Sequence, residues 1–88
     1  MHWDYEIDER ALKELKKLGK PKSARVIRYL GQHIVGSEDP RRFGKALRHG
    51  LSGLWFYRIG DIRAICQIKD EIVIVLVVRV GFRRDTFD

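Results

Sequence analysis

Residues 54–68, LWFYRIGDIRAICQI, constrain the fold most, because two strand-like segments flank a two-residue turn signal. Apolar residues alternate on both sides of Gly60-Asp61, and a leading glycine is typical of a two-residue β-hairpin turn. Pairing across this turn places Arg58 opposite Arg63 on one face of the hairpin. Like charges in directly opposed positions are unfavourable, so we expect an anionic group on this face.

The rest of the chain predicts two helices and further strands around this hairpin. Asp8 is a suitable N-cap for the first helix, Gly19 ends it, and Pro21 fits the first turn of the second. The expected elements are a strand at 2–8, helices at 9–18 and 21–35, a loop at 36–53 with a short strand near 45–49, and strands at 54–59, 62–68 and 72–80. The predicted buried stripes of the helices are Ala11, Leu12, Leu15 and Leu18, then Ala24, Ile27, Leu30 and Ile34. The order β-α-α-β-β-β favours an α+β domain over residues 1–88, with a helical hairpin on one face of a mainly antiparallel sheet.

The register of the last strand decides how many arginines share a face. If residues 69–71, KDE, form a three-residue loop, the core-facing residues are Ile72, Ile74, Leu76 and Val78. Arg79 and Arg83 then join Arg58 and Arg63, and the acid-free segment 41–48 adds Arg41, Arg42, Lys45 and Arg48 nearby. This pattern predicts a groove for a phosphate backbone, in which an exposed Phe56 stacks on a base or contacts a protein. The alternative is a solvated sheet face.

Net charge points to the same class of partner. The chain carries 18 Lys and Arg against 12 Asp and Glu, a formal net charge of +6. Such an excess in 88 residues favours an anionic partner, although it could also serve solubility alone. Residues 10–28 contain eight of these cations and only Glu14 as an acid. They form either a solvated helix surface or a docking face for ribosomal RNA.

Other features narrow the compartment and the chemistry. The lone Cys66 lies in an apolar run, which favours packing in a reducing compartment over catalysis. The N-terminus lacks a signal-peptide pattern, and the apolar stretch 71–80 is too short to span a bilayer. We therefore expect a cytoplasmic protein that does not bind membranes. No metal-ligand or phosphate-loop motif is present, so no cofactor is expected.

Three segments together resemble the RelE/ParE toxin superfamily, nearest its RelE branch. They are IDERALKELKKLG, KALRHGLSGLWFYRIGDIRAICQI and VIVLVVRVGFRRDTF, which follow the family order over nearly the whole chain. The resemblance implies the toxin of a bacterial type II toxin–antitoxin pair. RelE-type toxins enter the ribosomal A site and cut mRNA, whereas ParE-type toxins inhibit DNA gyrase.

The resemblance also implies a reaction and its residues. RelE-type cleavage needs no metal: a 2′-hydroxyl attacks the adjacent phosphate and leaves a 2′,3′-cyclic phosphate and a 5′-hydroxyl. Arg63 and Arg83 match the family's catalytic arginines, of which the first contacts the scissile phosphate. The positions expected to bind RNA are Arg48, Arg58, Lys45 and Arg84. A cognate antitoxin, mRNA and the rRNA of the ribosomal A site are the implied partners.

Three positions depart from the family pattern. Phe56 stands where relatives commonly have Arg or Lys, Phe82 where many have His or Lys, and Phe87 where an active RelE usually has Tyr. Because a phenyl ring cannot carry a proton, these changes predict weakened cleavage. The alternatives are an inactivated toxin that only binds its antitoxin and a ParE-like gyrase inhibitor.

Overall fold

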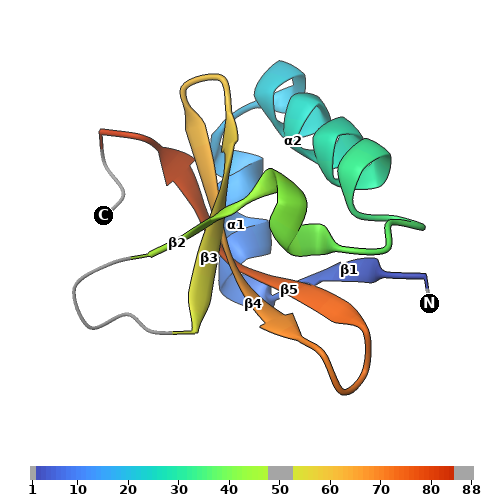
Figure 1. Ribbon diagram of the computed structural model, residues 1–88. Coiled ribbons are helices and arrows are strands. Elements are labelled where there is room, and N and C mark those ends of the chain that lie inside the picture. Colours follow the sequence, from blue (N-terminus) through green and yellow to red (C-terminus); the bar gives the residue numbers. More distant parts are fainter. Residues whose placement is uncertain (1, 48–52, 85–88) are drawn as a thin grey trace.

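The computed structural model describes residues 2–47 and 53–84 of the chain (Figure 1). In chain order the elements are β1 (Asp4–Ile7), α1 (Glu9–Lys17), α2 (Lys20–His33), the 3-10 helix η1 (Pro40–Phe43), β2 (Lys45–Ala46), β3 (Leu54–Ile59), β4 (Ile62–Lys69) and β5 (Ile74–Phe82). The five strands form one sheet in the order β1-β5-β4-β3-β2. β1 pairs with β5 in parallel and all other pairs are antiparallel. The predicted α+β class is therefore confirmed.

Local signals place the helix ends as the sequence predicts. The Asp8 carboxylate accepts hydrogen bonds from the backbone N–H groups of Arg10 and Ala11, which caps α1. Gly19 follows α1 with a φ of 88°, a conformation that favours glycine, and Pro21 lies in the first turn of α2. Neither helix within the described ranges combines the length and the apolar character that a membrane-spanning segment needs.

Both helices bury one face against the sheet. Figure 1 shows α1 behind the strands and α2 beside the β3–β4 hairpin. Their buried residues pack with Tyr57, Cys66 and Val77 in the main core. The burial of Cys66, which is fully inaccessible, confirms its predicted packing role.

Half of the predicted buried stripe of α2 was wrong. Ala24 and Ile27 are exposed, and the buried residues are Val26, Leu30 and Ile34. In α1 the residue placed wrongly is Leu12, which is 40% exposed. The same helical spacing fits two neighbouring stripes of α2, and contact with the sheet decides which one is buried.

The last strand also differs from the prediction. β4 continues to Lys69, so the turn to β5 is longer than three residues and includes Val73 at a φ of 59°. As a result Val75 and Val77 face the main core instead of the even-numbered residues. A β-bulge at Ile65/Cys66 then shifts the register back, and beyond it Val80 is the core residue. The longer turn and the bulge shift the register in opposite directions, so the two shifts cancel in the second half of β5.

Candidate nucleic-acid interface

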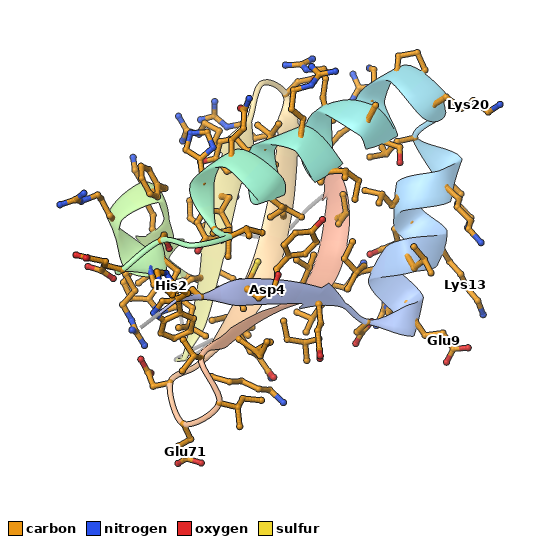
Figure 2. All side chains as sticks on the ribbon, turned by 90° about the vertical axis from the view of Figure 1, so that its right-hand side faces the viewer. His2, Asp4, Glu9, Lys13, Lys20 and Glu71 are labelled. Carbon is orange, nitrogen blue, oxygen red and sulfur yellow. The ribbon has the colours of Figure 1, made fainter. Side chains whose placement is uncertain are left out.

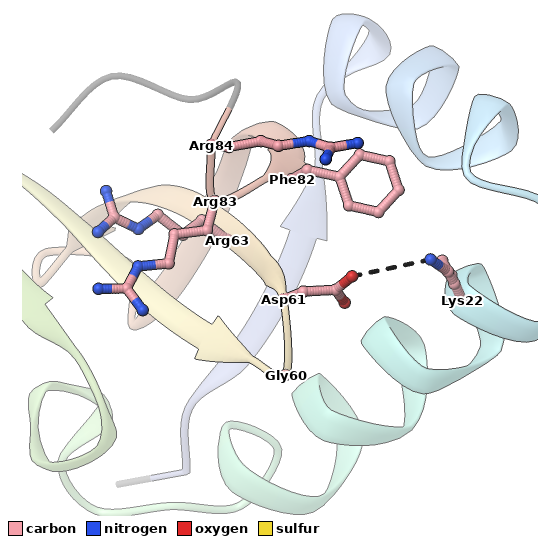
Figure 3. A pocket seen from close by; sticks show the side chains of 7 residues that line it. All are labelled: Lys22, Gly60, Asp61, Arg63, Phe82, Arg83 and Arg84. Carbon is pink, nitrogen blue, oxygen red and sulfur yellow. Dashed lines mark ion pairs between the residues drawn. The ribbon is translucent and has the colours of Figure 1, made fainter.

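A basic pocket of about 860 Å³ lies at the tip of the β3–β4 hairpin, beside the end of β5 and the first turn of α2. We call it the hairpin pocket (Figure 3). Its lining residues are Lys22, Gly60, Asp61, Arg63, Phe82, Arg83 and Arg84. Four cationic side chains thus face one carboxylate. The composition suits an anionic ligand of several charges.

Strand pairing brings the two predicted catalytic arginines together. The hairpin register is the predicted one, with Arg58 opposite Arg63. On the other side of β4, Arg63 pairs with Gly81 of β5, two residues before Arg83. The Arg83 backbone N–H donates to the Asp61 carbonyl oxygen at 2.8 Å. This bond ties the end of β5 to the hairpin tip, so Arg63 and Arg83 line one pocket although 20 residues separate them in the sequence.

Arg63 is held in place by an aromatic ring. It is only 5% exposed, and its guanidinium carbon lies 4.5 Å from the centre of the Phe56 ring. A guanidinium on a ring face in partly dry surroundings is attracted by the ring quadrupole. The burial and the ring contact fix the side chain before any ligand arrives.

The prediction that Phe56 is exposed was wrong. Its side chain is 9% exposed and packs with Leu47 and Ile65, with Leu54 and Val78 against them. These five residues form a second, smaller core on the sheet face away from the helices. A buried ring is not available to stack on a base, so Phe56 acts on a ligand through Arg63.

Phe82 has the more accessible ring. The Lys22 Nζ lies 4.6 Å from its centre and the Arg84 guanidinium carbon 5.9 Å from it. Lys22 also approaches the Asp61 carboxylate at 3.8 Å, where both side chains are largely exposed. An exposed pair of this length contributes little to stability, so Lys22 can exchange Asp61 for a ligand phosphate.

The remaining predicted positions do not join this pocket. Arg58 is exposed and lines a separate hollow with residues of α2. Lys45 is exposed on β2, opposite Phe56. Arg48 and Phe87 lie outside the described residues. Their expected roles stay predictions.

Arg79 was expected in the same groove, and the structure assigns it another partner. The bulge in β5, opposite Ile65/Cys66, does place it opposite Ile65, on the predicted side of the register. Its guanidinium, however, donates from Nε to both carboxylate oxygens of Glu14 at 3.0 and 3.2 Å. The ion pair anchors α1 to β5, and it makes Arg79 a structural residue.

Sequence reasoning did not assign Lys22 to the site. The sequence marks it only as one of eight cations in the helical hairpin. Its place in the pocket depends on how α2 is turned against the sheet, and half of the predicted stripe of α2 was wrong. The correct buried stripe of α2 was the one sequence signal that could have placed Lys22 beside the hairpin.

Two other kinds of site find no support in the described part of the chain. Among residues 2–47 and 53–84, no group of three His, Cys, Asp or Glu side chains is arranged to hold a metal ion. Burial raises the pKa of the Cys66 thiol, which therefore stays protonated and is a poor nucleophile.

Comparisons with known proteins identify the family of this chain. The family described as "ParE toxin of type II toxin-antitoxin system, parDE" matches residues 5–87. Toxin RelG of Mycobacterium tuberculosis is 34% identical over 77 residues, which cover 88% of this chain and 86% of RelG.

Solved structures of relatives share the fold. The toxin–antitoxin complex RelBE2 of M. tuberculosis contains a chain with a TM-score of 0.83 and 30% identity, covering 94% of this chain and 100% of that one. The isolated E. coli RelE toxin gives a TM-score of 0.71 at 32% identity, over 91% of this chain and 83% of that one. With this family match and these relatives, the chain belongs to the RelE/ParE superfamily of type II toxin–antitoxin toxins and is RelE-like.

Proposed function

We propose that this toxin cuts mRNA in the ribosomal A site by metal-free attack of a 2′-hydroxyl on the adjacent phosphate. The observation that carries the proposal is the meeting of Arg63 and Arg83 in one pocket, where Lys22 and Arg84 add positive charge. The RelE-like family assignment supports the same reaction, since it implies cleavage by paired arginines.

The arginines suit the charge that develops during this reaction. Attack on a phosphodiester gives a phosphorane whose equatorial oxygens carry more negative charge than the ground state. A guanidinium presents several N–H donors in a fixed plane and stays protonated throughout. Arg63 is oriented in advance by Phe56, so it loses little freedom when it binds the phosphorane. Arg83 would contact the same phosphate or the leaving oxygen.

Proton transfer is where we expect the reaction to be slow. The 2′-hydroxyl must lose a proton and the 5′-oxygen must gain one. Phe82 lines the pocket without a titratable group, and Phe56 is buried under Arg63. Losing a general acid or base typically lowers a rate by about 10²–10⁴-fold, so we expect weak cleavage.

An antitoxin is the expected protein partner, and we place the toxin in the cytoplasm with it. Structures similar to this chain include the RelBE2 complex of M. tuberculosis and the intact RelBE complex of E. coli. An antitoxin segment with acidic side chains would neutralise the arginines of the hairpin pocket. Binding would then block the pocket for RNA.

Primer extension on mRNA in a reconstituted translation reaction tests the proposal. We expect cuts confined to A-site codons with the wild-type protein, and none with Arg63→Ala/Arg83→Ala. A matched control is Lys13→Ala/Lys17→Ala, which removes two charges from the exposed side of α1 and should cut normally. An uncut message at high protein concentration, beside an active RelE-type toxin as positive control, would refute the endonuclease.

A second candidate function is that of a toxin that binds without cleaving. The observation that favours it is the burial of Phe56 where relatives commonly carry a base. In that case the protein still sediments with ribosomes but leaves the message intact, and Phe82→His/Phe87→Tyr restores cleavage.

The matching family is described as ParE toxin, so inhibition of DNA gyrase is the remaining alternative function. Inhibition of DNA supercoiling by purified gyrase, without any effect on translation, would identify that activity.

A further inference from the structure

A second hollow, of about 290 Å³, lies between α2 and the hairpin tip. We call it the helix pocket. Its polar lining consists of Arg25, Arg28, Tyr29, Gln32 and Arg58. Gly60 lines both this pocket and the hairpin pocket. Two basic hollows therefore flank a single β-turn.

The three arginines of the helix pocket carry no counter-charge from this chain. Arg25, Arg28 and Arg58 are exposed, and within residues 2–47 and 53–84 none of them pairs with a carboxylate. Arg41 and Arg79, by contrast, each hold a carboxylate at 3.0 Å or less. Gathering three like charges costs free energy unless an anion is bound among them.

Local geometry brings the charges to the turn. Arg25 and Arg28 are three residues apart, so they project from the same side of α2. A Cβ at Gly60 would collide with the Arg25 guanidinium, which can rest there because glycine has none. Gly60 also has a φ of 62°, which the turn requires. The same glycine therefore shapes the hairpin and admits Arg25 to its tip.

The neutral residues of the pocket suit an oxyanion as well. The Tyr29 hydroxyl donates to the Phe43 carbonyl oxygen at 3.5 Å, a long bond that it can exchange for one to a ligand oxygen. The Gln32 side-chain amide supplies further N–H donors. The described lining of the helix pocket contains no acidic side chain that would repel an anion.

We propose that the helix pocket binds a phosphate of an RNA backbone, in addition to the phosphate held in the hairpin pocket. The proposal rests on the proposed function for the identity of the nucleic acid. Continuity of the two pockets through Gly60 favours a polynucleotide, because such a ligand repeats its charge along its length. Guanidinium groups are also well suited to bidentate contact with phosphate.

Binding of a short 2′-O-methyl RNA strand, which cannot be cleaved by 2′-hydroxyl attack, tests this without ribosomes or catalysis. Fluorescence anisotropy measures Kd at several salt concentrations for the wild type and for Arg25→Gln/Arg28→Gln. We expect affinity to fall by about tenfold to a hundredfold, as for the loss of one charge-assisted contact. The slope of log K against log salt should become shallower by about 0.7 for each phosphate released.

Two further variants separate charge from geometry. Lys13→Gln/Lys17→Gln removes the same charge from α1, where Figure 2 shows Lys13 pointing away from the sheet, and should change Kd no more than about twofold by long-range attraction alone. Arg25→Lys/Arg28→Lys keeps the charge but loses the planar forks. We expect it to bind more weakly than wild type with an unchanged salt slope.

A hairpin RNA probe distinguishes the source of the phosphate. If the Arg25→Gln/Arg28→Gln loss appears only with the single strand, the pocket holds the strand that also enters the hairpin pocket. If it appears with the RNA stem, the pocket holds a structured RNA such as rRNA. Either result supports a phosphate site.

Two outcomes overturn the inference. In the first, Arg25→Gln/Arg28→Gln binds both RNAs as the Lys13/Lys17 control does. In the second, it binds RNA normally and loses only the antitoxin, which would make the helix pocket a protein-binding site. Neither outcome depends on cleavage, so failure of the endonuclease proposal alone would leave this test intact.

Discussion

Replacing Glu14 with alanine tests how α1 is fastened to the edge of the sheet. The Glu14 carboxylate accepts a hydrogen bond from the Val80 backbone N–H at 3.0 Å and forms an ion pair with Arg79, whose Nη2 lies 3.0 Å away. β1 pairs with β5 only as far as Val77, so this carboxylate replaces the missing strand partner at Val80. Glu14→Ala therefore leaves the Val80 backbone donor without this acceptor and removes the carboxylate that pairs with Arg79.

The expected loss of unfolding free energy lies between two limits. Fully exposed ion pairs contribute about 0–1 kcal/mol, and breaking a buried pair costs about 3–5 kcal/mol. The two side chains are 25% and 23% exposed, so the pair lies between these two limits. We expect Glu14→Ala to cost about 2–3 kcal/mol, which corresponds to a fall in Tm of roughly 10–20 °C for a domain of this size. A domain of this length is stable by only roughly 4–13 kcal/mol in total.

Urea denaturation followed by circular dichroism measures this loss. Glu38→Ala is the matched control, because Glu38 is an exposed loop carboxylate and its removal should change stability by less than about 0.5 kcal/mol. Adding Arg79→Met to Glu14→Ala should cost less than the sum of the single changes, since both changes remove the same ion pair. An equal loss of stability for Glu14→Ala and Glu38→Ala would show that the Glu14 carboxylate does not fasten α1 to β5.

Three shorter predictions concern groups outside the proposed catalytic chemistry. Burial raises the pKa of the Cys66 thiol, so a thiol-specific reagent should modify it only as fast as the chain unfolds; rapid labelling of the native protein would contradict the burial. Tyr57→Phe removes a hydroxyl that donates to the Pro40 carbonyl oxygen at 2.8 Å, and should cost about 1–3 kcal/mol in a denaturant titration, whereas a neutral result would mean that the carbonyl finds another donor. Hydrogen bonds from Arg41 hold the pKa of the Asp70 carboxyl below its ordinary 3.8. The stabilisation from Asp70 is therefore present above pH 3.8 and lost as the pH falls through the lower native pKa. In thermal melts, the Tm of wild type should exceed that of Asp70→Asn at neutral pH, and the two Tm values should converge below pH 3.8. A Tm difference that stays constant with pH would contradict this.

Much of the fold could be predicted from local patterns because those patterns act over a few residues. The Gly60-Asp61 turn fixes the hairpin register, since a two-residue loop leaves one way to pair the flanking strands. The Asp8 cap and the Gly19 stop likewise act within one helical turn. Each prediction of this kind agrees with the structure.

The predictions that were wrong all depend on contacts between distant segments. Phe56 alternates onto the outer face as expected, but Leu47 and Ile65 cover it and make a second core there. The bulge at Ile65/Cys66 has no marker in the local sequence, and it reverses the facing of half of β5. The stripe of α2 is set by the sheet beneath it, because its apolar residues fit more than one helical face.

The candidate site divides along the same line. The place of Arg63 beside a hairpin turn follows from local pattern, since it needs only the alternation of a strand and a glycine turn. Packing between separate elements brings Arg83 and Lys22 to Arg63 in one pocket and turns Arg58 toward α2 instead. A pocket forms where separate elements pack together, and that packing depends on register, bulges and helix rotation, which no single segment encodes.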